Sequence, residues 1–240
     1  MNFKNKPIFG MIHLSMSQHE DSRILRARRE MELLEEEGVD GIIIENYHGS
    51  LSDVKDVLEA NKSFLETTKL IVGINILPND YEEALRLASR YNGKFIQMDY
   101  VAGDYKHTEP IKKAHFNAMR EVFSDIKIFG GVWPKYYYPV KNSVLEVDIA
   151  EGKKMADAIV VTGSGTGQVT PLDKIKEFRN HCGEHPLIIG AGLTVETVAE
   201  QLQFADGAIV GSCFKKAGQT SNEIDRELVK EFMSEVKKIR

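Results

Sequence analysis

The sequence has 240 residues, of which 42% are hydrophobic and 28% are charged, a size and composition that fit one α/β domain over residues 1–240. A formal net charge of −5 without any basic block argues against nucleic acid or an anionic membrane surface as the main partner. Two cysteines, Cys182 and Cys213, are too few for a disulfide framework or a zinc motif.

Short apolar runs alternate with helical patterns along the first half of the chain. The helical segments have apolar residues at spacings of three and four, whereas the strand segments are almost continuously apolar, as in a parallel sheet buried on both faces. Asp80 and Glu83 have the spacing of a capping pair at the start of one helix. The pattern predicts strands at 7–14, 39–45, 69–77 and 95–98, and helices at 21–38, 51–64 and 81–91.

The same alternation continues through the second half. The segment W-P-K-Y-Y-Y-P at 133–139 follows a fifth strand, and Ser143 with Glu146 has the spacing of a second capping pair. Three more strand–helix units come after it. The pattern predicts strands at 126–132, 158–161, 186–189 and 207–210, and helices at 111–123, 143–155, from 171 onward, 194–202 and 224–236.

About eight strand–helix units without a linker predict a single closed (β/α)8 barrel, the TIM barrel, rather than a doubly wound sheet. Right-handed crossovers between parallel strands place the carboxyl ends of all strands on one face. We therefore expect the functional site at that face, the mouth of the barrel.

Glycine-bearing turns follow the last three predicted strands: T-G-S-G-T-G at 162–167, G-A-G-L-T at 190–194 and G-S at 211–212. Glycine lets backbone N–H groups approach a ligand, and turns that open a helix present donors that suit a phosphate. Three such turns predict one phosphate pocket; the alternative is that they are only tight connections. They match neither a dinucleotide fingerprint nor a P-loop. The predicted binding residues are Thr162, Gly163, Gly165, Gly190, Gly192, Gly211 and Ser212.

Charged residues at or just beyond other strand ends are the candidate catalytic groups. Glu45 and Asp99 each end a buried run and suit acid–base work, unless a neighbouring lysine or backbone amides merely satisfy them. Lys135 is either a cation for phosphate or an oxyanion, or a solvated loop lysine. His13 is either a proton carrier near neutral pH or a hydrogen-bonded core histidine.

Two asparagines, Asn46 and Asn75, also follow predicted strands. They would orient substrate hydroxyl groups, or else pair with the barrel backbone. The tyrosines at 136–138 would stack on a ligand ring or close the mouth, and packing within the loop is the alternative.

No metal and no cofactor are predicted. The seven histidines show no paired helical spacing, and no Cys–His cluster exists in the sequence. A hard cation such as Mg²⁺, held by Glu45 or Asp99, is the alternative.

Four segments together resemble the BtpA/SgcQ family: G-V-D-G-I-I-I-E-N at 38–46, V-G-I-N-I-L-P-N-D at 72–80, D-A-I-V-V-T-G-S-G-T-G at 157–167 and A-D-G-A-I-V-G-S at 205–212. The resemblance runs from about Pro7 to the last helix. It implies a phosphate-binding barrel of the ribulose-phosphate-binding type. The founding member of that family is tied to photosystem I biogenesis or stability, and other members occur with sugar-metabolism genes.

Two segments depart from the pattern of this family. A Pro/Gly-rich segment after the first family histidine is replaced by S-M-S-Q at 15–18, and Asp-Val-x-Val-Lys-His of the fifth strand is G-V-W-P-K-Y at 131–136. Lys135 matches, whereas Gly131 and Tyr136 stand where the family has Asp and His. A reaction mechanism that requires this Asp and this His could not operate with Gly131 and Tyr136.

These observations predict an enzyme acting on a small phosphorylated metabolite, a pentose or hexose phosphate or a ribosyl derivative. Isomerisation, epimerisation, lyase cleavage and glycosidic hydrolysis stay open as the reaction. The rival prediction is a non-catalytic assembly or stability factor for a membrane protein complex. The first ten residues lack the apolar core of a signal peptide and no run approaches transmembrane length, so a cytoplasmic protein without an integral membrane segment is expected. The sequence leaves a homo-oligomer open.

Overall fold

Eight parallel strands close into a barrel in this computed structural model, which describes residues 1–14 and 20–240. Each strand pairs with the next one in chain order, and the last pairs with the first. The predicted closed (β/α)8 barrel is therefore confirmed. The strands are β1 (Ile8–His13), β2 (Gly41–Glu45), β3 (Ile71–Asn75), β4 (Phe95–Met98), β5 (Lys127–Gly131), β6 (Ala158–Val161), β7 (Leu187–Ile189) and β8 (Gly207–Val210).

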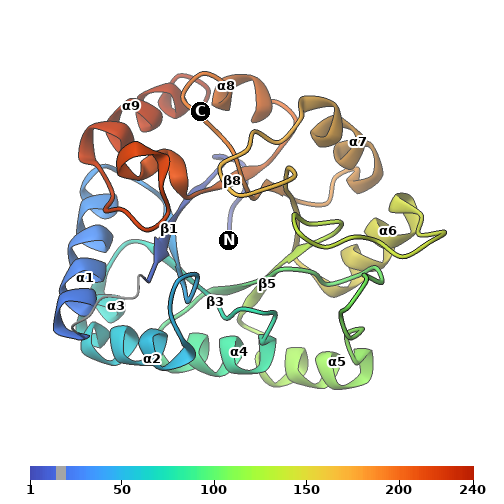
Figure 1. Ribbon diagram of the computed structural model, residues 1–240, viewed down its shortest axis with the longest axis horizontal. Helices are drawn as coiled ribbons and strands as arrows, with labels where there is room; N and C mark the ends of the chain where they lie inside the picture. Colours follow the sequence, from blue (N-terminus) through green and yellow to red (C-terminus); the bar gives the residue numbers. More distant parts are fainter. Residues whose placement is uncertain (15–19) are drawn as a thin grey trace.

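The helices form a ring outside the strands (Figure 1). Within the described residues, no helix is long and apolar enough to cross a membrane. The helices are α1 (Glu20–Glu36), α2 (Leu51–Ala60), α3 (Lys62–Thr67), α4 (Tyr81–Arg90), α5 (Lys113–Val122), α6 (Leu145–Met155), α7 (Leu172–Cys182), α8 (Val198–Gln201) and α9 (Arg226–Lys237), with 3-10 turns η1 (Ser212–Phe214) and η2 (Lys216–Gly218) after β8.

Local capping signals were only partly correct. Asp80 caps α4, because its Oδ1 accepts a hydrogen bond from the Glu83 N–H at 3.1 Å. The predicted capping pair of Ser143 and Glu146 is wrong: α6 begins at Leu145, and the Ser143 hydroxyl instead donates to the Val140 carbonyl at 2.9 Å. The predicted helix 51–64 is divided at Asn61 into α2 and α3. The departure at residues 15–18 lies outside the described residues.

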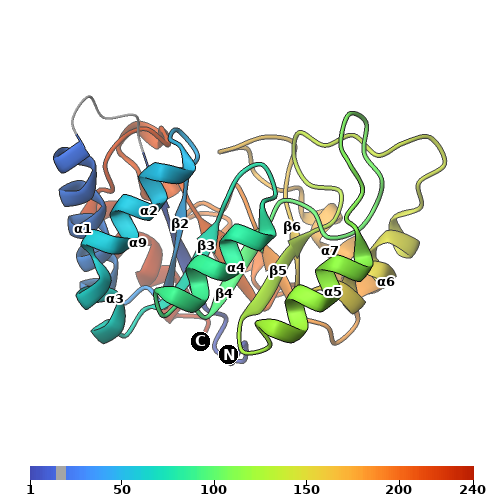
Figure 2. The ribbon, with the colours of Figure 1, turned by 90° about the horizontal axis from the view of Figure 1, so that it is seen from below.

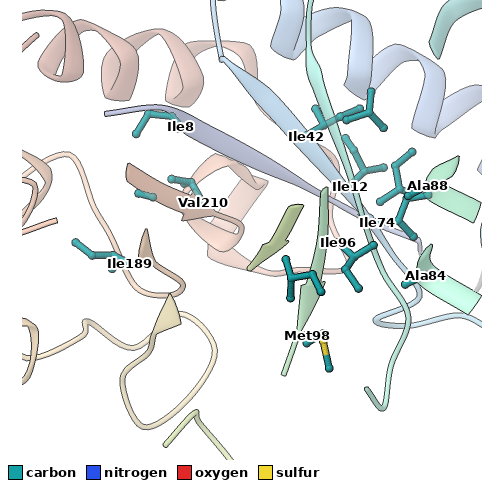
Figure 3. Packing of buried hydrophobic residues seen from close by; sticks show 14 of the residues in the cluster. Ile8, Ile12, Ile42, Ile74, Ala84, Ala88, Ile96, Met98, Ile189 and Val210 are labelled. Carbon is teal, nitrogen blue, oxygen red and sulfur yellow. The ribbon is translucent and has the colours of Figure 1, made fainter. Parts of the chain in front are cut away.

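Alternate residues of each strand face the barrel interior and the surrounding helices, which gives two apolar layers. The interior layer contains Phe9, Phe95 and Phe129, with ring centroids 4.3 to 5.4 Å apart. Figure 3 shows part of the outer layer, where strand residues pack against α4. Its labelled members include Ile12, Ile42, Ile74 and Ile96 from the strands and Ala84 and Ala88 from α4.

A buried ion pair joins the last strand–helix unit to the first. Lys215 follows β8, is 0% exposed, and its Nζ donates to Glu30 Oε2 of α1 at 2.9 Å. The other oxygen, Glu30 Oε1, accepts from Arg26 Nε at 2.9 Å and from the Ile224 N–H at 3.1 Å. The Glu30 carboxylate therefore links α1 to two segments near the end of the chain, at Lys215 and at Ile224.

The two ends of the chain lie together on the face opposite the mouth (Figure 2). The Arg240 guanidinium donates a hydrogen bond to the Lys6 carbonyl at 3.1 Å. The long loops after β4 and β5 stand at the other face, where the strands end (Figure 2).

Candidate active site

Three predicted site residues end the first three strands and are direct neighbours in the sheet. His13 pairs with Glu45, and Glu45 pairs with Asn75. All three share the parity of the interior-facing residues of their strands, and all are buried. The sheet register therefore brings an imidazole, a carboxyl and an amide together on one side of the mouth.

Asn46 comes one residue later and has the opposite parity. Its Oδ1 accepts from the Leu77 N–H at 2.8 Å, and its Nδ2 donates to the Leu77 carbonyl at 3.2 Å. The side chain thus pairs with the backbone after β3, which was the structural alternative for this residue. Asn75, by contrast, directs its amide to the Glu45 carboxyl.

Glu45 is a buried carboxyl group held by two neighbours. Asn75 Nδ2 donates to Glu45 Oε1 at 2.6 Å, and His13 Nε2 lies 3.5 Å from Glu45 Oε2. Burial, reinforced by the charge of Asp99, raises the pKa of Glu45 to about 8, although Lys135 and Asn75 act in the opposite direction. Glu45 is therefore mainly protonated at neutral pH. A carboxylic acid in this state can deliver a proton to a bound molecule.

His13 is held in its neutral form by its surroundings. Burial lowers its pKa well below the usual 6.5, and the positive charges of Lys215 and Lys135 lower it further. A neutral imidazole beside a neutral carboxyl makes this side of the mouth nearly uncharged at neutral pH.

The second carboxyl group, Asp99, lies beyond the end of β4. The Tyr137 hydroxyl donates to Asp99 Oδ2 at 2.6 Å. Burial raises the pKa of Asp99, and the Tyr137 hydrogen bond and the Lys135 charge offset part of that rise. Two carboxyl groups with raised pKa values thus face the same mouth, which is a common feature of acid–base sites.

A cluster of hydroxyl groups surrounds Lys135. Its Nζ donates to Thr166 Oγ1 at 2.9 Å, and its backbone N–H donates to Thr162 Oγ1 at 2.7 Å. Thr166 Oγ1 is also hydrogen-bonded to the Tyr47 hydroxyl at 3.0 Å and accepts from the Tyr136 hydroxyl at 3.1 Å. This cluster ties the loops after β2, β5 and β6 to one another across the mouth.

The mouth contains two adjoining cavities. We call them the glycine compartment, of about 410 Å³, and the tyrosine compartment, of about 690 Å³, both counted out to their open sides. Both are lined by Glu45, Tyr47, Gln97, Lys135 and Gly190. The glycine compartment adds Met11, His13, Thr166, Gly167, Ala191, Gly192, Ile209, Gly211 and Ser212. The tyrosine compartment adds Leu77, Met98, Asp99, Gly131, Pro134, Tyr136, Tyr137, Val160 and Thr162.

Four of the seven residues predicted to bind phosphate, Gly190, Gly192, Gly211 and Ser212, line the glycine compartment. A side chain at Gly192 is not tolerated, because its φ is +74° and a Cβ would lie 1.9 Å from the Gln168 carbonyl oxygen. The structure does not bring Gly163 and Gly165 to this compartment. They shape the loop after β6, where a Cβ on either would lie 3.2 Å from an atom of Gln168. Thr162 lines the tyrosine compartment.

Three polar lining residues, Gln97, Tyr47 and Thr166, were not among the predicted site residues. Gln97 lies inside β4 with interior parity, and its signal was an amide within the otherwise apolar run F-I-Q-M. Tyr47 and Thr166 meet across 119 positions of sequence, and a contact of that range leaves no local pattern. A prediction based on strand ends therefore does not identify site residues such as Tyr47 and Thr166, which lie in the loops.

The described residues contain no group of three His, Cys, Asp or Glu side chains that could hold a metal ion. Glu45 and Asp99 are the only predicted ligands for Mg²⁺, and Lys135 places a positive charge beside both of them. A site for a divalent cation usually concentrates negative charge and oxygen ligands. The use of no metal stays a prediction.

The raised pKa of Glu45 predicts a particular pH dependence of stability. Between about pH 4.5 and 8, Glu45 holds a proton in the folded protein but has lost it in the unfolded chain. The free energy of unfolding therefore falls as the pH rises through this range. The slope is at most about 1.4 kcal/mol per pH unit for one group. Urea unfolding at pH 6.5 and pH 8 should show this fall.

Comparison with Glu45→Gln isolates this contribution. Asp99, whose pKa is also raised, remains in both proteins, and His13 acts in the opposite direction only below about pH 6.5 because its folded pKa is lowered. The variant should lose less stability than the wild type between the two pH values. Equal losses would show that Glu45 is already ionised in the folded protein.

Comparison with known sequences gives full-length matches. The model of the BtpA family matches residues 4–238. An uncharacterized protein of Thermococcus kodakarensis is 28% identical over 261 residues, which cover 100% of this chain and 98% of the relative. The photosystem I biogenesis protein BtpA of Synechocystis sp. is 28% identical over 250 residues, which cover 95% of this chain and 87% of the relative.

Comparison with solved structures finds TIM barrels. Thiamine phosphate pyrophosphorylase from Pyrococcus furiosus has a TM-score of 0.67 at 12% identity, with 99% of this chain and 98% of that chain covered. N-(5'-phosphoribosyl)anthranilate isomerase from Pyrococcus furiosus has a TM-score of 0.63 at 16% identity, with 97% and 99% covered. At such identities the likeness shows the shared fold alone.

Proposed function

The chain belongs to the BtpA family, and from this membership together with the geometry of the mouth we propose that it is an enzyme acting on a small phosphorylated sugar or ribosyl metabolite. One observation carries the proposal. The buried Glu45 carboxyl, with its pKa raised to about 8, lines the same cavity as the glycine turns after β7 and β8. A phosphate held by those turns would place the rest of the substrate over a proton donor.

The remaining polar groups suit acid–base chemistry on such a substrate. Glu45 and Asp99 would transfer protons, and Lys135 would neutralise charge that develops on an oxygen. His13 and Asn75 would hold the Glu45 carboxyl in place. Isomerisation, epimerisation, lyase cleavage and glycosidic hydrolysis each need proton transfer of this kind. The names of the two structural neighbours above refer to phosphorylated molecules, which supports a phosphorylated ligand.

Phosphosugars are expected to raise the melting temperature, whereas their dephosphorylated forms are not. Ribose 5-phosphate at about 100 times its Kd would add about 2.7 kcal/mol. For a chain of this size that corresponds to a rise of about 5–10 °C. Gly211→Asp should abolish the rise, because the added Cβ would lie 3.0 Å from His13 Cε1 and the carboxylate would repel a phosphate. Differential scanning fluorimetry with ribose 5-phosphate and ribose measures both effects.

Ser63→Asp is the matched control for this variant. It adds the same carboxylate to the exposed surface of α3, away from the mouth, and should leave the rise unchanged. If Gly211→Asp binds ribose 5-phosphate as the wild type does, the phosphate does not sit in the glycine compartment.

The second candidate function is a non-catalytic assembly factor. Two observations favour it: the Synechocystis relative is named for photosystem I biogenesis, and Tyr138, Val144 and Val147 are 53–70% exposed in the segment after β5. Exposed apolar side chains of this kind suit contact with another protein. A protein with this role alone would gain no stability from phosphosugars, so the thermal-shift result separates the two candidates.

A further inference from the structure

Resting on the proposed function, we propose that the mouth binds a substrate with two unlike halves, a phosphate in the glycine compartment and a nitrogen-bearing planar ring in the tyrosine compartment. The substrate class is then a sugar phosphate that carries a heterocyclic ring, such as an N-ribosyl ring 5-phosphate. A free sugar phosphate would fill only one half of the site. The sugar would lie over the residues that both compartments share, among them Glu45.

The walls of the tyrosine compartment suit a ring better than a sugar. A sugar placed there would turn some of its hydroxyl groups toward apolar walls that offer no hydrogen-bond partner, which is unfavourable where water is excluded. A flat apolar ring removes the apolar walls from water and can stack on tyrosine. The apolar and aromatic walls are Leu77, Met98, Pro134, Tyr136, Tyr137 and Val160.

Two polar groups in this compartment point to nitrogen on the ring. Gln97 belongs to the wall that both compartments share, and its Oε1 is buried and has no hydrogen-bond partner among the described residues. The Asp99 carboxyl, fixed by the Tyr137 hydroxyl at 2.6 Å, offers a second oxygen. Buried acceptors of this kind are satisfied by N–H groups. A hydrocarbon ring would leave Gln97 unpaired.

The glycine compartment has fewer apolar lining residues: Met11, Ala191 and Ile209. Gly167, Gly192 and Gly211 bring backbone to its surface without side chains, and Ser212 adds a hydroxyl group. Lys135 is a shared wall and supplies positive charge. Compact anions bind such surfaces through backbone N–H groups, whereas a ring would find no apolar wall of comparable extent.

Thr166 lines the glycine compartment and is bonded to residues of the tyrosine compartment. Its hydroxyl is held by Lys135, Tyr47 and Tyr136 at 2.9 to 3.1 Å. The loop after β6 is thus bonded across the mouth to Tyr136 of the aromatic walls and to Lys135 and Tyr47, which line both compartments. Each half of the substrate would have a compartment of its own.

Isothermal titration calorimetry with matched probes tests this inference. The probes are inorganic phosphate, ribose 5-phosphate, ribonucleosides, and ribonucleoside 5′-monophosphates with purine and pyrimidine bases. At least one monophosphate should bind about tenfold or more tightly than ribose 5-phosphate, since stacking of one base on an aromatic side chain commonly contributes this much. The matching nucleoside should bind more weakly than its monophosphate.

Variants of adjacent tyrosines assign the preference to the tyrosine compartment. Tyr136→Ala removes one aromatic wall and should lower the affinity for the monophosphate to near that for ribose 5-phosphate measured with the same variant, compared with Tyr136→Phe, which loses the same hydroxyl contacts to Thr166. Tyr136→Phe keeps the ring and should keep the preference. Tyr138→Ala is the matched control, because Tyr138 is 70% exposed and lines neither compartment.

The outcomes separate this inference from the proposed function. If ribose 5-phosphate binds as tightly as every monophosphate, the ring site is wrong and the phosphosugar enzyme stands. A preference that survives Tyr136→Ala also overturns the assignment to the tyrosine compartment. If no phosphate ester binds at all, the proposed function fails together with the inference.

Discussion

Glu45→Gln is expected to reduce turnover about 10²-fold or more, while folding and ligand binding stay near normal. A positioned proton carrier usually contributes at least this factor, and an amide cannot take its place. Glutamine keeps the shape of the side chain, and its Oε1 can still accept the hydrogen bond that Asn75 now donates to Glu45 at 2.6 Å. The measurement is kcat and KM on a phosphosugar substrate, with the Tm recorded for each protein.

Glu66→Gln is the matched control for this experiment. Glu66 is exposed on α3 and should tolerate the same substitution with no loss of turnover. A purely structural Glu45 predicts the opposite pattern: the variant would melt earlier but retain its turnover per folded molecule. Unchanged kcat in a well-folded Glu45→Gln protein would reject the catalytic role.

Lys215→Met is expected to lower the free energy of unfolding by about 3–5 kcal/mol. Removing one partner of a buried ion pair leaves the other charge in a poorly hydrated place, and Glu30 would keep only the Arg26 side chain as a counter-charge. For a chain of this size the Tm should fall by about 6–20 °C. Urea unfolding and calorimetry measure the two quantities.

Two further variants test whether the effect comes from the buried ion pair. Lys216→Met removes a charge that is mostly exposed and should change stability by less than about 1 kcal/mol. Replacing Lys215 by methionine together with Glu30 by glutamine should recover part of the loss, since the amide carries no charge and its Oε1 can still accept from Arg26 Nε and from the Ile224 N–H. A Lys215→Met protein as stable as Lys216→Met would contradict the buried ion pair.

Much of the barrel could be predicted because the burial of a strand or a helix produces a pattern of apolar residues within a short stretch of sequence. Strands such as β2 contain a run of apolar residues, here Ile42, Ile43 and Ile44, and the helices between the strands have a different period. The division of the predicted helix at Asn61 could not be predicted in this way, because two consecutive helices have almost the same apolar pattern as one long helix. The wrong capping prediction at Ser143 has a related cause. The spacing of Ser143 and Glu146 shows that a capping hydrogen bond is possible. It does not show that the Ser143 hydroxyl donates to the Val140 carbonyl of the preceding turn instead.

Beyond the glycine turns, the side chains of the candidate site were predictable mainly at strand ends, where the strand determines their direction. Glu45 and Asn75 follow from that rule, and Asn46 shows its limit, because one step along the chain turns a side chain to the other face. Tyr47, Thr166 and Lys215 depend on contacts between distant segments. Such contacts arise from the closed barrel and are absent from any short window of sequence.

The hydrogen bond between Arg240 and Lys6 holds both ends of the chain on the face opposite the mouth, which is useful when the protein is tagged or immobilised. Tags, surface anchors or fused partners attached to either end would leave the opposite face clear, so immobilised molecules would all present their mouths to the solution. The two ends are also close enough for a short peptide to join them, and the chain could then be reopened at an exposed loop to give a circular permutant.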